Sequence, residues 1–188
     1  DKLIAVKEGL KTNLPGIVVC DLTDGKAAEK MVSAARVVLN CAGPYSVQNG
    51  DVLLGACARQ GKHYSDLSGE SFWQREMVDA FHNIAAKSGA KIVLGGGVDS
   101  IPSDLGAFLA LKALQPREGE QVEVTGVYNE YTGSFSGGTL TSGEAIAAAV
   151  KSGRLPKTLR RDPYILAPGV VGADSAVGTL NGFARKAL

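Results

Sequence analysis

Residues 37–67 read VVLNCAGPYSVQNGDVLLGACARQGKHYSDL. The apolar run at residues 37–40 is typical of a buried strand, residues 51–60 have the pattern of a helix, and residues 63–67 read as a second short strand. A strand, a helix and a second strand in this order form a βαβ unit, in which the two strands are parallel. This stretch therefore predicts an α/β fold.

The same alternation continues on both sides of this unit. Short apolar runs separated by longer helical patterns favour a doubly wound parallel sheet, covered by helices on both faces. The further elements that we expect are helices over residues 1–12, 27–35, 72–88 and 102–114, and strands over residues 17–20 and 91–94.

The pattern changes near Pro116. Residues 115–121 form a polar linker, and residues 122–131 alternate imperfectly, as a strand of a mixed or antiparallel sheet would. A turn rich in Gly and Ser and a helix over residues 140–151 follow. We therefore expect a first domain over residues 1–115 and part of a second, α+β domain with a mixed sheet over residues 116–188.

Composition and charge exclude several classes of function. Lys and Arg number 20 and Asp and Glu 19, and a net charge of +1 argues against a nucleic-acid partner. The sequence has three cysteines, Cys20, Cys41 and Cys57, and none of them forms a C-x-x-C pair. It therefore predicts neither a disulfide framework nor a metal site. Cysteines used in this way are typical of a reducing compartment, so we expect a cytoplasmic location. No run approaches the about 18 apolar residues of a transmembrane helix.

Ligands of a doubly wound sheet bind beyond the carboxyl ends of its strands. Asp21 follows the strand expected at residues 17–20, and its carboxylate is able to accept hydrogen bonds from an adenine or a ribose. A turn or a helix cap is an equally good interpretation of this aspartate. The next strand is followed by small residues that let a ligand approach the backbone and by a tyrosine that offers a ring face and a hydroxyl. These residues are Asn40, Cys41, Ala42, Gly43, Pro44 and Tyr45.

The strand at residues 63–67 leads into a dense polar cluster. Side chains alternate along a strand, so Tyr64 and Asp66 face the same way and form the stronger candidate pair for proton transfer, while His63 faces the other side. The alternative is an edge strand whose Asp66 and Ser68 cap the next helix. The cluster reads His63-Tyr64-Ser65-Asp66-Leu67-Ser68-Gly69-Glu70.

A triple glycine follows the strand at residues 91–94. Three successive glycines leave backbone N–H groups open at a helix N-terminus, a place that favours anionic or polar groups. Initiation of the helix explains part of the motif, because Ser100 suits an N-cap and Pro102 the first turn. The candidate ligand-binding residues here are Gly97, Asp99 and Ser100.

Several familiar motifs are missing from the sequence. It contains no G-x-x-x-x-G-K-[ST] phosphate loop, no H-E-x-x-H and no G-x-S-x-G, so kinase, metalloprotease and hydrolase functions lose their usual support. A G-x-G-x-x-G loop is also absent.

Taken together, these junctions resemble the saccharopine dehydrogenase-like oxidoreductases. The similarity runs in order over about residues 17–164 and includes the segments Ser136-Gly137-Gly138-Thr139 and Arg161-Asp162-Pro163-Tyr164. It implies a Rossmann domain that binds NADP or NAD, followed by a second domain that often forms a homodimer. It also implies that residues 40–45 lie along the dinucleotide and residues 99–102 near the nicotinamide. The glycine-rich loop of that family is not in the sequence, so we interpret the chain as cut inside a larger protein.

The resemblance predicts hydride transfer between a nicotinamide and a small-molecule substrate. Tyr64, Asp66 and Asp99 are then the candidates for handling the proton. The candidate segments contain almost no Arg or Lys, which favours a weakly charged substrate. Alternatives are a trans-acting enoyl reductase of lipid or polyketide chains, a non-catalytic Rossmann-like protein that binds a nucleotide or a lipid, and a structural domain.

Overall fold

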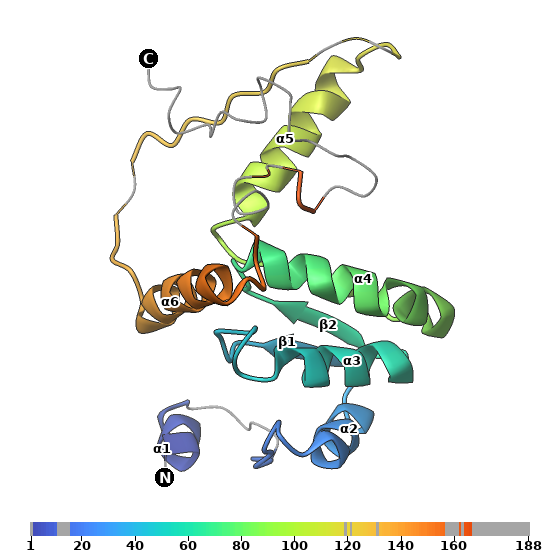
Figure 1. The fold of residues 1–188 in the computed structure, drawn as a ribbon, viewed down its shortest axis with the longest axis vertical. Helices are drawn as coiled ribbons and strands as arrows, with labels where there is room; N and C mark the ends of the chain where they lie inside the picture. Colours follow the sequence, from blue (N-terminus) through green and yellow to red (C-terminus); the bar gives the residue numbers. More distant parts are fainter. Residues whose placement is uncertain are drawn as a thin grey trace.

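A computed structural model of the chain describes residues 2–10, 16–118, 120, 122–130, 132–156, 162 and 164–166. It contains a sheet of three parallel strands in the order β1-β2-β3, with helices between them (Figure 1). The α/β class predicted from the sequence is confirmed. The elements are α1 (Lys2–Gly9), α2 (Gly25–Ser33), β1 (Val37–Asn40), α3 (Gly50–Gln60), β2 (His63–Asp66), α4 (Ser71–Ser88), β3 (Ile92–Val93), α5 (Ile101–Leu114) and α6 (Gly137–Ser152).

One face of the sheet carries the core. Val38 pairs in register with Tyr64, and Tyr64 pairs with Ile92, so these side chains share the face that α3 and α4 cover. On the other face Leu39 is 64% exposed, and Val37 and Val93 are exposed as well. Within the described part of the chain, α3 and α4 thus pack on a single face, and the cover by helices on both faces that the sequence predicted is not seen.

Two strands expected from the sequence are not formed. Residues 17–20 and 122–130 have no regular secondary structure, and Val19 is 84% exposed. A strand obtains its backbone hydrogen bonds from a neighbouring strand, whereas a helix makes them within itself. No strand among the described residues pairs with either segment. The mixed sheet expected for the second domain is therefore not seen in the described part of the chain, and Tyr131 lies outside it.

Trp73 is the largest fully buried side chain among the described residues. Its ring stacks on that of Tyr45, with the ring centroids 5.4 Å apart and the planes 27° apart. Tyr64 and Leu54 pack in the same cluster, as does Ala149 from α6. Helix α6, which the sequence assigned to the second domain, therefore packs against the core formed by α3, α4 and the sheet.

The helices α3 and α4 both end at a glycine with positive φ. Gly61 has φ = 67° and Gly89 has φ = 80°, the left-handed conformation that glycine adopts without steric cost. A Cβ at Gly61 would lie 2.8 Å from the carbonyl oxygen of Ser88, whereas a Cβ at Gly89 would meet nothing within 4 Å. The two sites are matched in conformation and differ in the space around them.

We expect Gly61→Ala to lower the free energy of unfolding more than Gly89→Ala does. The Gly89 variant pays only the left-handed backbone cost of about 1 kcal/mol. The Gly61 variant adds a backbone clash, for a total of about 2–4 kcal/mol. Urea unfolding of both variants measures the difference, and equal losses would show that the contact between Gly61 and Ser88 does not constrain the fold.

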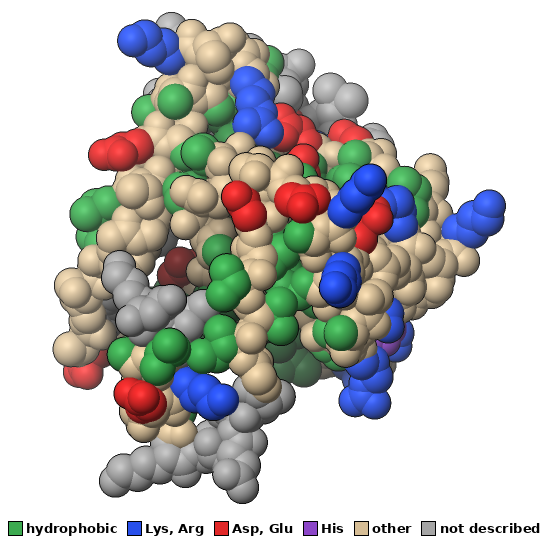
Figure 2. Space-filling model, turned by 90° about the horizontal axis from the view of Figure 1, so that it is seen from below, with side chains coloured by type: hydrophobic (Ala, Val, Ile, Leu, Met, Phe, Trp, Pro, Cys, Tyr) green, Lys and Arg blue, Asp and Glu red, His purple; other side chains and the backbone are tan. Residues whose placement is uncertain are grey.

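The described helices include none long and apolar enough to cross a membrane. On the face seen in Figure 2, basic and acidic side chains lie among apolar ones.

Candidate functional site

The loops that follow the three strands meet at one edge of the sheet, because parallel strands present their carboxyl ends on the same side. Asn40 and Asp66, the last residues of β1 and β2, are direct partners in the register. We call this region the strand-end site. It comprises Asn40, Cys41, Ala42, Gly43, Pro44, Tyr45, Tyr64, Asp66, Gly97, Asp99 and Ser100.

Tyr64 and Asp66 point to the same side of β2, as predicted. The Tyr64 hydroxyl donates to Oδ2 of Asp66 over 3.1 Å and accepts from Nδ2 of Asn40 over 3.1 Å. All three side chains are buried. Burial, together with the neighbouring Asp66 carboxylate, raises the pKa of Tyr64 far above its ordinary value, so this hydroxyl keeps its proton and remains a donor.

Asp66 is the centre of a buried hydrogen-bond network. Its Oδ1 accepts from the N–H of Ser68 over 3.0 Å, from the hydroxyl of Ser68 over 2.7 Å, and from the N–H of Gly95 over 2.8 Å. Gln74 adds a bond from Nε2 to the carbonyl oxygen of Ser68. One carboxylate thus holds the loops after β2 and β3 together, and its partners satisfy the charge that it buries.

The turn after β1 has an exposed part and a buried part. Residues 41–43 are exposed, whereas Pro44 and Tyr45 are buried. The Tyr45 hydroxyl donates to the carbonyl oxygen of Asn40 over 3.0 Å and accepts from the N–H of Leu67 over 3.2 Å. Since its ring also packs on Trp73, Tyr45 supports the turn from below, and the exposed part of this turn is the backbone of residues 41–43.

The triple glycine after β3 is explained mainly by close packing. Gly95 has φ = 65°, and its N–H donates to Asp66. A Cβ at Gly96 would lie 2.7 Å from the Ser65 hydroxyl oxygen, and the N–H of Gly96 donates to the carbonyl oxygen of Asp66 over 2.7 Å. The expectation that three open N–H groups await a ligand is therefore wrong for two of them.

The remaining residues of this loop start helix α5. The carbonyl oxygen of Gly97 accepts from the N–H of Ser100 over 3.2 Å and from that of Ile101 over 2.9 Å. Ser100 occupies the expected N-cap position, but its side chain makes no capping hydrogen bond. Asp99 is exposed, so of the three proton-handling candidates only this one is open to solvent.

Asp21 and Ala42 line the same cavity, which has a volume of about 460 Å³. It is lined by residues 19–23 and by Ala42, Gln48 and Asn49. Asp21 is exposed, and its Oδ1 accepts from the N–H and the hydroxyl of Thr23, bonds that lower its pKa below the ordinary value. Asp24, and not Asp21, caps helix α2. Asp21 thus takes part in a turn, which is one of the two expected interpretations. Its carboxylate also lies at the wall of a cavity next to residues 40–45, which we call the candidate cofactor turn.

The lining of this cavity suits the nucleoside part of a dinucleotide better than its pyrophosphate. Its volume lies within the range of about 300–1,000 Å³ that is usual for small-molecule sites. The carboxylate of Asp21 and the amides of Gln48 and Asn49 suit the hydroxyls and nitrogens of a nucleoside. None of the described residues that line it is a lysine or an arginine, so the lining offers no cationic side chain to a pyrophosphate.

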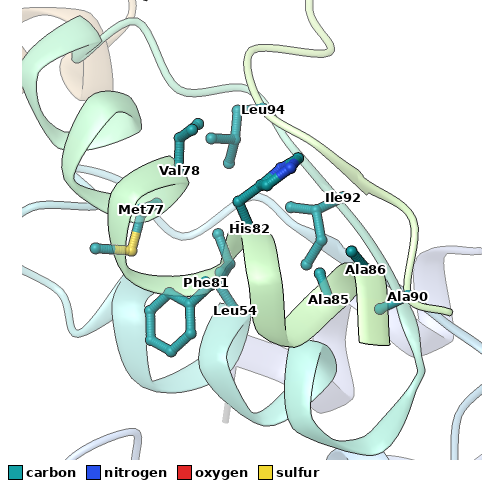
Figure 3. A pocket seen from close by; sticks show the side chains of 10 residues that line it. All are labelled: Leu54, Met77, Val78, Phe81, His82, Ala85, Ala86, Ala90, Ile92 and Leu94. Carbon is teal, nitrogen blue, oxygen red and sulfur yellow. The ribbon is translucent and has the colours of Figure 1, made fainter. Parts of the chain in front are cut away.

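A second cavity, of about 260 Å³, has a different lining (Figure 3). Its lining is almost entirely apolar and comes mainly from α4 and the segment around β3. None of the candidate residues is part of it. The lining residues are Leu54, Met77, Val78, Phe81, His82, Ala85, Ala86, Ala90, Ile92 and Leu94.

Sequence reasoning recognised Glu70 only as a possible proton-transfer residue of the polar cluster, and it missed Gln74 and Ser46, which support the site with it. Glu70 and Gln74 are buried and hydrogen-bonded to the loops, and Ser46 joins the same network. Glu70 belongs to the polar cluster recognised after β2, but the alternation of the strand does not extend to it. A glutamate directly before a long helix with an apolar face was the signal available in the sequence.

Comparison with known proteins finds relatives over most of the chain. It is 33% identical over 180 residues to a putative trans-acting enoyl reductase of Mycobacterium tuberculosis (strain H37Rv), a match that covers 94% of this chain and 42% of the relative. It is 36% identical over 152 residues to a trans-acting enoyl reductase of Mycobacterium ulcerans (strain Agy99), covering 80% of this chain and 36% of that protein.

A third relative, a trans-acting enoyl reductase of Mycobacterium bovis (strain BCG / Pasteur 1173P2), is 33% identical over 172 residues, which cover 90% of this chain and 41% of that protein. The chain therefore spans less than half the length of these relatives. No family model and no solved structure matches it. The names of the relatives point to oxidoreductases.

Proposed function

We propose that this chain forms part of an NAD(P)H-dependent enoyl reductase. The observation that carries the proposal is its similarity to three proteins named trans-acting enoyl reductase over 80–94% of its length. The matched part includes a parallel sheet whose strand ends carry the candidate cofactor turn. The saccharopine dehydrogenase-like resemblance stays a prediction, and the enoyl reductase alternative agrees better with these names.

The proposed reaction is the reduction of a carbon–carbon double bond conjugated to a carbonyl group. A bound nicotinamide cofactor supplies the hydride. In this chain, Asp21 would hold the nucleoside part of the cofactor, and the exposed backbone of residues 41–43 would run along it. Asp99 is the solvent-accessible candidate for passing the proton, while the buried Tyr64 and Asp66 hold the strand-end loops in place.

Titration with NADPH and with NADH, followed by nicotinamide fluorescence, tests the proposal. The titration uses the 188-residue chain and a form extended to the full length of the relatives, both first shown to be folded. We expect the extended form to bind one of the two cofactors and to oxidise it when an α,β-unsaturated acyl thioester is added. Binding without turnover would instead indicate the non-catalytic alternative, and no binding by either form would refute the proposal.

A matched pair of variants tests whether the cofactor binds in the cavity beside Asp21. Ala42→Glu puts bulk and negative charge at the wall of the cavity beside Asp21, and we expect it to raise the dissociation constant of the cofactor at least tenfold. Ala86→Glu makes the same change at an exposed alanine of the second, apolar cavity and should leave that constant unchanged. If both variants bind alike, the cofactor does not occupy the cavity next to Ala42.

The same proposal includes a homodimer formed through the second domain. Light scattering of the extended form measures its mass in solution, and the mass of a single chain would contradict this part of the proposal.

A further inference from the structure

Glu70 is a buried acidic residue that the proposed reaction does not use. It is the last residue before α4, and its side chain is 0% exposed. Its Oε1 accepts from the N–H of Tyr45 over 2.8 Å, and its Oε2 accepts from the N–H of Ser46 over 3.1 Å. The hydroxyl of Ser46 also donates to Oε2, and that of Ser142 lies 3.4 Å from Oε1.

These contacts fix the course of the backbone just after the exposed residues 41–43. Two consecutive N–H groups point at the two oxygens of one carboxylate, which as an acceptor-only group matches both of them. A carboxamide has one oxygen and one NH₂ group, so it would leave one of the two N–H groups facing another donor. The arrangement therefore depends on a carboxylate and not merely on a side chain of this size.

A residue just after helix α6 (Gly137–Ser152) also contacts this segment. The guanidinium of Arg154, just after α6, donates from Nη1 to the carbonyl oxygen of Ser46 over 3.3 Å. It also forms an ion pair with Glu76, with 2.6 Å between Nη2 and Oε2, and lies 5.4 Å above the ring of Phe72. Ser46 is thus bound through its N–H and hydroxyl by Glu70 and through its carbonyl by Arg154, which joins the turn to α4 and α6.

We infer that Glu70 is a positioning residue: its carboxylate holds the N–H groups of Tyr45 and Ser46 and so sets the cofactor turn in the conformation that receives the dinucleotide. This inference rests on the proposed function for the identity of the ligand, but the contacts that carry it are within the chain. Glu70 touches no solvent and so acts on the ligand only through the turn.

The variant Glu70→Gln, in the extended form, tests this role by two separate measurements. Amide hydrogen exchange at Tyr45 and Ser46 should become at least tenfold faster, while exchange at Gly95, whose N–H is held by Asp66, should stay as in the unmodified protein. The dissociation constant of the cofactor, measured by nicotinamide fluorescence, should rise at least tenfold. Glu29→Gln is the matched control, because it makes the same substitution in an exposed ion pair, the one with Arg59, and leaves the contacts that Glu70 and Arg154 make with the turn in place.

The outcomes separate this inference from the proposed function. If the unmodified protein binds no dinucleotide, the proposed function fails, and the exchange measurement still shows whether Glu70 holds the turn. Faster exchange everywhere, Gly95 included, would overturn the positioning role in favour of a general loss of stability. Localised faster exchange with an unchanged dissociation constant would overturn it as well. Should Glu70→Gln not fold, Glu70→Asp keeps both oxygens on a shorter stem and is expected to show the same localised change at smaller size.

Discussion

Asp66→Ala is expected to lower the free energy of unfolding by about 3–5 kcal/mol. The substitution removes the acceptor of two buried backbone N–H groups, those of Ser68 and Gly95. It also removes the acceptor of the Tyr64 and Ser68 hydroxyls. Asp66→Asn keeps Oδ1, which accepts three of the four bonds, and changes only the contact with Tyr64. Its expected cost is about 1 kcal/mol. Chemical denaturation followed by tryptophan fluorescence measures both variants.

The same pair of variants separates the two roles considered for Asp66. If this carboxylate handles a proton in the reaction, Asp66→Asn abolishes turnover in a protein that stays folded. If Asp66 only joins the loops after β2 and β3, Asp66→Asn keeps most of the turnover. Equal destabilisation by alanine and by asparagine would contradict the network described around Oδ1.

Trp73→Ala is expected to lower the free energy of unfolding by about 3–5 kcal/mol, the usual cost of removing a buried tryptophan. The ring is buried and stacks on Tyr45, so its loss also leaves the turn after β1 without this support. Thermal unfolding followed by circular dichroism measures the effect, since Trp73 is the single tryptophan of the chain and its own fluorescence is lost in the variant.

Two further variants define the cause of this loss. Trp73→Phe keeps a ring against Tyr45 and should lose less than half as much stability. Phe135→Ala removes an aromatic side chain that is 78% exposed, and its effect should stay within about 0.5 kcal/mol. A loss at Phe135 as large as that at Trp73 would show that the stacked core around Tyr45 is not what holds the turn.

The part of the fold predicted best is the segment from β1 to α5. There each apolar run or helical pattern in the sequence is found as an element, and no end differs from the expected one by more than one residue, as at both ends of β3 (Ile92–Val93). The segments at residues 17–20 and 122–130 have equally apolar or alternating sequences but form no strand. The difference is the partner: a helix completes its own hydrogen bonds, whereas a strand depends on another segment.

In the candidate site, too, the sequence predicted the local features and not the contacts between distant segments. The sequence by itself determined that β1, β2 and β3 are parallel and that Tyr64 and Asp66 share a face, because both follow from local periodicity and from the βαβ connection. Only the tertiary structure decided that the Tyr45 ring packs in the core and that Glu70 holds the turn after β1. It also decided that the N–H groups of Gly95 and Gly96 donate hydrogen bonds to Asp66. The Tyr45–Glu70 and Asp66–Gly95 contacts join residues 25 and 29 positions apart in the sequence, and no local pattern records which distant loop supplies the donor for a buried carboxylate.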